Sequence, residues 1–194
     1  MFTNSHKTSQ DPAEYSWFDN KFSEEEIVAV EDYIQQLPIM KGNFGDAEAA
    51  SDERKSEVRW IYRNEETDWL YEKMISLANT ANEGLWQFDM FNVHEVIQYT
   101  EYFDNGGHYD WHLDMGPGYP GNQRKISMTV QLSDGKDYSG GEFEMMRGRG
   151  GIEQLPKGKG TVLVFPSFLL HRVTPVTRGV RKSLVLWLGG ASFK

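Results

Sequence analysis

Two stretches in the first half of the chain repeat their apolar residues at the three- and four-residue spacing of a helix face. The first begins at Ser23, which forms a capping-box pattern with Glu26, and it ends before Pro38. In the second stretch Asn64 is the expected cap, and acidic residues follow it in the first turn. The pattern predicts two helices that pack on a core through Ile27, Val30, Ile34 and Leu37 in the first and Leu70, Met74, Leu77 and Ala81 in the second.

After Gly84 the apolar residues alternate instead, which is typical of strands. Alternation runs over 86–90 and 93–102, and again over 125–133, where the polar face could line a barrel interior or meet water. Further strands are predicted at 141–146, 160–165 and 182–188. About eight strands behind two helices predict a mainly β fold with flanking helices (α+β). A double-stranded β-helix, or jelly roll, with the N-terminal helices packed on one sheet fits this pattern.

The length of 194 residues suits one domain with its own core. We expect a single domain over residues 1–194, with a helical part at about 17–84 and a jelly-roll core at about 86–190. Residues 1–16 have no periodicity and are expected to be a loose arm. The polar stretch 41–57 predicts a long exposed loop, either a plain surface loop or a lid over a site.

Composition excludes several classes of protein. The chain has no cysteine, so disulfides, thiolate metal sites and cysteine nucleophiles are excluded. The net charge of -9 disfavours a general binder of the nucleic-acid backbone, although a local basic patch stays compatible with it. The sequence contains no signal-peptide pattern and no apolar run of membrane-spanning length, so we expect a cytoplasmic protein that does not enter the membrane.

The stretch 102–114, YFDNGGHYDWHLD, carries the candidate chemistry. His112 and Asp114 are two residues apart, so an extended strand would point both side chains to one face, where they could hold one metal ion. His108 and Asp110 have the same spacing and the same parity, so alternation alone leaves both pairs open. A distant histidine would complete a 2-His-1-carboxylate set, which leaves metal positions free for substrate and oxygen.

His171 is the best placed of the other histidines, because it follows an apolar run and a turn and so lies at a strand boundary. Arg181 comes ten residues later and shares a strand face with Ser183 and Trp187. An arginine on a strand usually meets solvent, and a tryptophan there often only packs in a core. Beside a metal, however, an arginine is suited to a bidentate grip on a carboxylate.

Together these residues resemble the iron(II)/2-oxoglutarate-dependent oxygenases, in particular the prolyl-4-hydroxylase-like branch of bacterial and phage type. The resemblance covers about 86–190 and depends on the order and spacing of Tyr102, Gly106 and Tyr109 before His112-x-Asp114, of GGE (140–142) and FPS (165–167), and of His171, Arg181 and Trp187. It favours His112 and Asp114 over the rival pair, because the rival pair would misplace both tyrosines.

The resemblance implies that His112, Asp114 and His171 hold Fe(II), and that 2-oxoglutarate and O2 take the open positions. It also implies cosubstrate contacts from Tyr102, Arg181, Ser183 and Trp187, with Arg181 on the far carboxylate. Gln131 stands where many prolyl hydroxylases have a tyrosine that touches this carboxylate, so the family's contacts are not carried over completely. Gln131 is a candidate cosubstrate contact, and the group that replaces the tyrosine stays open. Trp187 stands where nucleic-acid-dealkylating relatives carry a second arginine, which makes a nucleic-acid substrate a poor fit.

The expected function is therefore a dioxygenase that hydroxylates a protein or peptide side chain, with proline as a candidate, and releases succinate and CO2. Ascorbate is a further candidate cofactor. Three alternatives stay open: the same chemistry on a small molecule, a zinc hydrolase on the same fold, and a metal-binding jelly roll that senses a ligand without turnover. The zinc alternative leaves Arg181 without a role.

Overall fold

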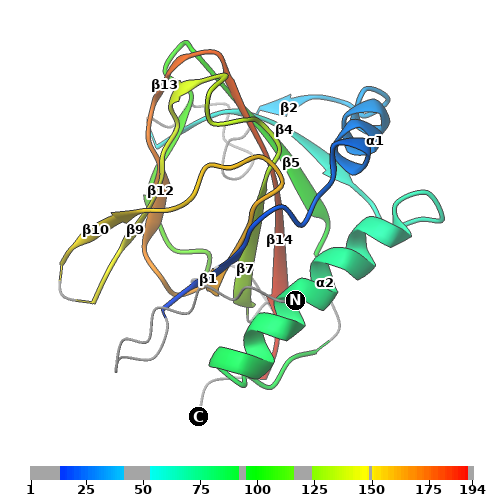
Figure 1. Cartoon of the computed structure of the whole chain (residues 1–194), viewed down its shortest axis with the longest axis vertical. Coiled ribbons are helices and arrows are strands. Elements are labelled where there is room, and N and C mark those ends of the chain that lie inside the picture. Colours follow the sequence, from blue (N-terminus) through cyan, green and yellow to red (C-terminus); the bar gives the residue numbers. More distant parts are fainter. Residues whose placement is uncertain (1–13, 42–52, 92–94, 116–123, 149, 192–194) are drawn as a thin grey trace.

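The computed structural model describes residues 14–41, 53–91, 95–115, 124–148 and 150–191, which form two main antiparallel sheets and two helices (Figure 1). The larger sheet has the strand order β1-β11-β7-β14-β5-β4-β2. Its strands are β1 (Ser16–Phe18), β2 (Met40–Lys41), β4 (Glu57–Ile61), β5 (Ile97–Phe103), β7 (Arg124–Gln131), β11 (Val162–Pro166) and β14 (Val180–Gly189). Strand β14 lies at the centre and is paired on both sides, by β5 and β7.

The smaller sheet has the order β10-β9-β12-β6-β3. Its strands are β3 (Arg54–Lys55), β6 (His108–His112), β9 (Phe143–Met146), β10 (Ile152–Gln154) and β12 (His171–Val173). A two-stranded ribbon of β8 (Ser139–Gly140) and β13 (Val176–Arg178) accompanies the two sheets. This is a double-stranded β-helix with flanking helices, so the predicted fold class is confirmed.

Both helices, α1 (Glu24–Ile34) and α2 (Asp68–Leu85), lie on the same side of the larger sheet (Figure 1). The predicted capping box is present at the start of α1, where the Ser23 hydroxyl accepts from the Glu26 amide at 3.3 Å and the Glu26 carboxylate accepts from the Ser23 amide at 2.8 Å. The buried faces of the helices join the apolar side of the sheet in one core cluster. No helix among the described residues combines the length and the apolar composition that crossing a membrane requires.

Strand β7 shows which face of the larger sheet can carry a site. Its apolar residues Ile126, Met128 and Val130 belong to the core cluster under the helices. The alternate residues are buried as well, although they are polar: Lys125, Ser127, Thr129 and Gln131. The polar face of this strand therefore lines the interior between the two sheets, as the first of the two sequence interpretations had it.

Two local predictions were wrong. Helix α2 begins at Asp68 with Thr67 as its cap, because the Asn64 side chain instead accepts from the amides of Glu66 and Thr67 and closes the turn before the helix. The stretch 86–90 is not a strand and has only an isolated bridge at Met90. Here the Asn82 side chain takes both backbone hydrogen bonds of Phe88, which a neighbouring strand would otherwise make.

The described ends of the polar stretch 41–57 include strand residues. Residues 42–52 lie outside the described residues, as do most of the predicted N-terminal arm, the Gly/Pro stretch 116–123, His6 and His94. The end of the stretch pairs into both sheets, with β3 beside β6 and β4 beside β5. The expectation of an exposed loop is therefore wrong for Arg54, which is buried because β3 places it in the interior.

Candidate active site

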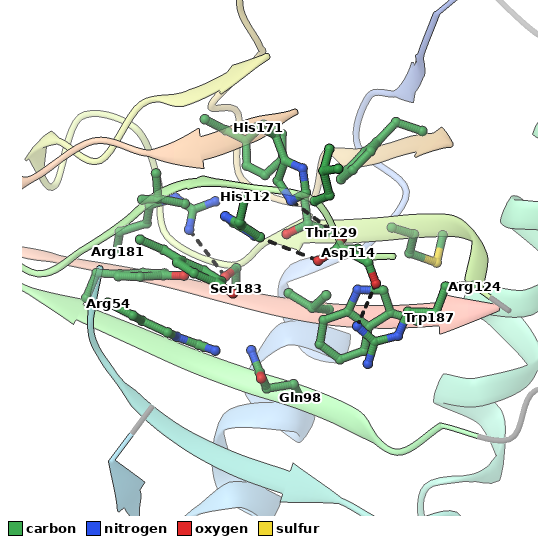
Figure 2. A pocket seen from close by; sticks show the side chains of 18 of the residues that line it. Arg54, Gln98, His112, Asp114, Arg124, Thr129, His171, Arg181, Ser183 and Trp187 are labelled. Atoms are coloured by element: carbon green, nitrogen blue, oxygen red, sulfur yellow. Dashed lines mark hydrogen bonds and ion pairs between the residues drawn. The ribbon is translucent and has the colours of Figure 1, made fainter. Parts of the chain in front are cut away.

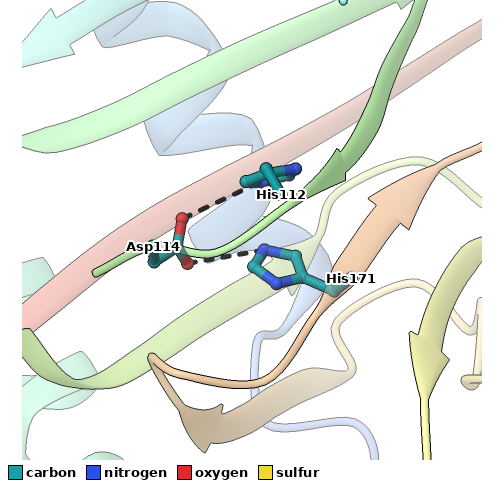
Figure 3. Close-up of side chains that lie close together, drawn as sticks. All are labelled: His112, Asp114 and His171. Atoms are coloured by element: carbon teal, nitrogen blue, oxygen red, sulfur yellow. Dashed lines mark ion pairs between the residues drawn. The ribbon is translucent and has the colours of Figure 1, made fainter. Parts of the chain in front are cut away.

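The two candidate histidines are brought together by strand pairing. Strands β6 and β12 are antiparallel neighbours, and His112 is the direct register partner of His171. Asp114 follows the end of β6 and turns its carboxylate toward both rings (Figure 3). Its two oxygens lie 3.7 Å from His112 Nε2 and 3.4 Å from His171 Nε2. The three ligand atoms all lie within 4.8 Å of one another.

Hydrogen bonds to the backbone orient both imidazoles. His112 Nδ1 lies 2.7 Å from the Asp110 carbonyl, and His171 Nδ1 lies 2.8 Å from the Leu169 carbonyl. Because a carbonyl only accepts, each Nδ1 donates and each Nε2 keeps its lone pair for a metal. Two imidazole nitrogens and one carboxylate oxygen in this arrangement fit Fe(II), and they leave further coordination positions open.

The electrostatics of the cluster favour the protonation states that bind metal. Burial, together with the neighbouring His171, lowers the pKa of His112 to about 3, so its ring is neutral at physiological pH. Burial would raise the pKa of the Asp114 carboxyl, but the two imidazoles and the Ser127 hydroxyl outweigh it and hold that pKa below its usual value. The site therefore offers the neutral imidazole of His112 and the ionised carboxylate of Asp114.

The rival pair lies apart from this cluster. His108 Nδ1 is 2.8 Å from the Gly106 carbonyl, and the exposed Asp110 carboxylate accepts from the Trp111 amide at 2.7 Å. The register of β6 against β12 shifts by one residue between Tyr109 and His112, which places these two rings in a stack with centroids 3.5 Å apart. The side chains of residues 108–114 therefore do not alternate strictly between the two faces of the strand, because the register shift interrupts the alternation.

A cavity of about 260 Å³ opens beside the three ligands, between the two sheets (Figure 2). Four of the five predicted cosubstrate contacts line it: Tyr102, Arg181, Ser183 and Trp187. The fifth, Gln131, lies behind Arg181 and accepts from its Nη2 at 3.0 Å. The structure thus assembles all the predicted site residues in one place.

Arg181 is the most unusual charge in this cavity. It is 1% exposed, and no carboxylate in the described part of the chain forms an ion pair with it. Its Nη1 donates to the Ser183 hydroxyl at 3.3 Å, its face lies over the Tyr102 ring at 5.4 Å, and its Nε has no partner. A buried cation that has only neutral partners is suited to an anionic ligand, because burial makes an unpaired charge costly. The far carboxylate of 2-oxoglutarate fits this requirement.

Residues 97–189 match the 2OG-Fe(II) oxygenase superfamily, a segment that includes all three candidate metal ligands and Arg181. The match covers just under half of the chain, which is therefore similar to this family. The chain is 38% identical over 126 residues to a PKHD-type hydroxylase of Teredinibacter turnerae, which covers 60% of the chain and 55% of that protein. A PKHD-type hydroxylase of Aliarcobacter butzleri is 26% identical over 157 residues, or 77% of the chain and 69% of that protein. The chain thus spans only part of the length of these two relatives.

Solved structures give the same fold. A Pseudomonas putida prolyl-4-hydroxylase superposes on this chain with a TM-score of 0.71 at 21% identity, covering 92% of this chain and 94% of the other. A Trichoplax adhaerens prolyl hydroxylase, solved with a peptide fragment of hypoxia inducible factor, gives 0.75 at 16% identity over 91% and 84%. At these identities the likeness shows the jelly-roll fold.

Sequence reasoning missed two residues beside the candidate site. Arg54 lines the cavity from β3, lies over the Tyr109 ring at 4.7 Å, and has an Nη2 that is buried without a partner. The buried phenol of Tyr138 lies close to Arg181; burial raises the pKa of Tyr138 and the guanidinium opposes that rise. Neither residue carries a sequence signal, because Arg54 stands in a polar stretch and Tyr138 in a turn-rich one.

Proposed function

We propose that this oxygenase hydroxylates a protein or peptide side chain, with proline as the first candidate, and converts 2-oxoglutarate and O2 to succinate and CO2. The observation that carries the proposal is the buried Arg181, which lines the same cavity as the His112–Asp114–His171 cluster and forms no ion pair with any described carboxylate. A dicarboxylate that chelates the metal at one end would bring its far carboxylate to this guanidinium.

The residues that line the cavity have defined parts in the proposed reaction. Fe(II) would supply the oxygen-activating chemistry, and the protein supplies position, charge and exclusion of water. Arg181 neutralises the far carboxylate, and its planar guanidinium can make two parallel hydrogen bonds to it. Ser183 and Gln131 fix the guanidinium from two sides, as their hydrogen bonds to Nη1 and Nη2 indicate. Trp187 and Tyr102 wall the pocket and keep it dry.

A peptide substrate is supported by the relatives and by the cavity. PKHD-type hydroxylases are similar in sequence, and a prolyl hydroxylase with a bound peptide shares the fold. The free Nη2 of Arg54 can donate to an acceptor on the substrate, such as a peptide carbonyl or an acidic side chain. The half-exposed Leu113 adds an apolar contact to the same lining.

The test is a peptide panel incubated with Fe(II), 2-oxoglutarate and ascorbate, scored by mass spectrometry for one added oxygen atom and by succinate release. Proline-containing and proline-free versions of each peptide separate proline from other targets. We expect at least one peptide to gain an oxygen atom with the release of one succinate per oxygen added. The Arg181→Ala variant should lose both signals at a low concentration of 2-oxoglutarate. Succinate release without any modified peptide would point to a small-molecule substrate. Absence of succinate under all conditions would contradict the proposal.

A further inference from the structure

The metal-ligand candidate Asp114 is held by few backbone contacts. It lies beyond the end of β6, so no strand ladder fixes its main chain. Its amide donates to the Ser167 carbonyl at 3.1 Å, and its carbonyl accepts from Arg124 Nη1 at 3.1 Å. The main chain of Asp114 is therefore held by one turn and by one arginine side chain, while its carboxylate also interacts with the Ser127 and Trp187 side chains.

Arg124 is itself fixed from two further directions. Its Nε and Nη2 donate to the two oxygens of Glu95 at 2.6 and 2.5 Å, which is a bidentate pair. Its guanidinium carbon lies 4.0 Å from the centroid of the Trp187 ring, and Figure 2 shows the two side chains against each other. Only 8% of Arg124 is exposed. A single guanidinium thus connects Glu95, the Asp114 backbone and the indole that walls the cavity.

We propose that Arg124 is a positioning residue that sets the orientation of Asp114 and Trp187, and that Glu95 holds Arg124 in the required plane. A buried ion pair is by itself weak evidence for stability, because desolvation offsets much of its attraction. The geometry explains why arginine is present. Three donors are used in one plane at once, two on Glu95 and one on Asp114, and a lysine ammonium cannot reproduce this planar arrangement.

A matched pair elsewhere in the chain provides the control. Arg59 and Glu101 also form a partly buried pair, with side chains 11% and 13% exposed, and Arg59 also lies over an aromatic ring, that of Tyr99 at 5.7 Å. In the described part of the chain, this pair belongs neither to the metal-ligand cluster nor to the lining of the cavity. Removing either arginine should cost stability, but only Arg124 should affect metal binding.

The experiment measures the binding of Co(II), an oxygen-stable substitute for Fe(II), to the variants Arg124→Met, Arg124→Lys, Glu95→Gln and Arg59→Met. The readouts are Co(II) affinity by titration, the visible absorption of bound Co(II), and the Tm of the metal-free protein. We expect Arg124→Met to weaken Co(II) binding about 10- to 100-fold, the range typical of lost outer-shell partners, and to shift the absorption. Arg124→Lys should restore part of the Tm but not the absorption, and Glu95→Gln should weaken binding less than Arg124→Met.

Arg59→Met should lower the Tm and leave Co(II) affinity and absorption unchanged. If Arg124→Met, like Arg59→Met, lowers the Tm without changing Co(II) affinity or absorption, the Arg124–Glu95 ion pair only stabilises the fold and the proposal is wrong. If Arg124→Met does not fold, Glu95→Gln decides instead. Weaker Co(II) binding in Glu95→Gln supports the proposal, and unchanged Co(II) binding contradicts it. These readouts require no hydroxylation, so failure of the peptide panel would overturn the proposed function and leave this inference standing.

Discussion

The two sheets carry the two ends of the candidate site in different ways. The larger sheet holds the proposed carboxylate-binding end on long strands, because Arg181 and Ser183 lie on the ten-residue β14, flanked by β5 and β7. The smaller sheet holds the histidines on the short strands β6 and β12, and Asp114 lies outside any strand. Long ladders fix the first end, whereas short ladders together with individual side-chain hydrogen bonds fix the second.

The surroundings of the sheets differ too. The larger sheet is covered on its outer face by both helices and joins them in the larger core cluster. The smaller sheet contributes to a second cluster between the sheets, which contains Tyr109, Phe143 and Val173. We infer that the metal ligands can be changed with little effect on folding, and that changes on β14 act on a more cooperative part of the structure.

The largest expected effect comes from the metal ligands. Replacing His112, Asp114 or His171 by alanine should weaken Fe(II) binding by more than about 100-fold, since losing an outer-shell partner already costs 10- to 100-fold. Turnover should disappear and the circular dichroism spectrum should stay native. Anaerobic Fe(II) titration and thermal unfolding of the three variants measure both effects.

His108→Ala and Asp110→Ala are the controls, since they change the same kinds of side chain on the same strand outside the cluster. Both variants should bind Fe(II) like the unchanged protein. Loss of iron in Asp110→Ala with retention in Asp114→Ala would show that the ligand assignment is displaced by four residues.

The second effect concerns Arg181. A charge-assisted hydrogen bond contributes about 1.5–3 kcal/mol, so Arg181→Ala should weaken 2-oxoglutarate binding about ten- to hundred-fold. Arg181→Lys should fall between, because lysine keeps the charge and loses the planar pair of donors. Anaerobic binding of 2-oxoglutarate to the Fe(II) form measures this, and Fe(II) affinity should stay unchanged in both variants.

Lys182→Ala is the matched control on the same strand. Its ammonium pairs with Glu31 of α1 at 2.8 Å, on the helix-covered side of the sheet. Its removal should leave 2-oxoglutarate affinity unchanged. If Arg181→Ala binds the cosubstrate as the unchanged protein does, the carboxylate-binding role is refuted while the metal site can still be correct.

A smaller effect is expected at Gln131, which accepts from Arg181 and is 1% exposed. Gln131→Leu removes this acceptor at similar volume, so 2-oxoglutarate binding should weaken about five-fold, or about 1 kcal/mol. Gln131→Glu should weaken it more, because a carboxylate there would compete with the cosubstrate for the guanidinium. The same anaerobic titration measures both, and equal affinities in the two variants would contradict this role for Gln131.

The sequence predicts best where a feature is periodic over a long element. Helix α1 and strands β7 and β14 follow their apolar patterns closely. His171 lies on β12 and Arg181 on β14, and only the short strand β13 and its turns separate the two. The fold class followed from these elements, whereas the set of site residues followed from the resemblance to a known family. On this side of the molecule the local pattern and the tertiary contacts agree.

Prediction failed where a side chain or a distant strand decides the local structure. The one-residue register shift in β6 breaks the alternation that made His108 and His112 look equivalent. Arg54 is buried only because a two-residue strand pairs with β6, and Arg124 reaches Asp114 across a stretch of sequence with no regular pattern. These contacts are set by tertiary packing, which periodicity does not encode.

The smallest expected effect separates stability from the site. Ser23 caps α1, which packs on the larger sheet away from the metal ligands. Ser23→Ala removes one half of the capping box and should lower the free energy of unfolding by about 1 kcal/mol. Ser76→Ala is the control, because Ser76 is an exposed residue inside α2 and alanine is the better helix former there. Denaturant unfolding should show a loss for Ser23→Ala and none for Ser76→Ala, with Fe(II) and 2-oxoglutarate affinities unchanged in both. A change in either affinity in Ser23→Ala would mean that the helix-covered face and the site are coupled through the larger sheet, against the separation argued above.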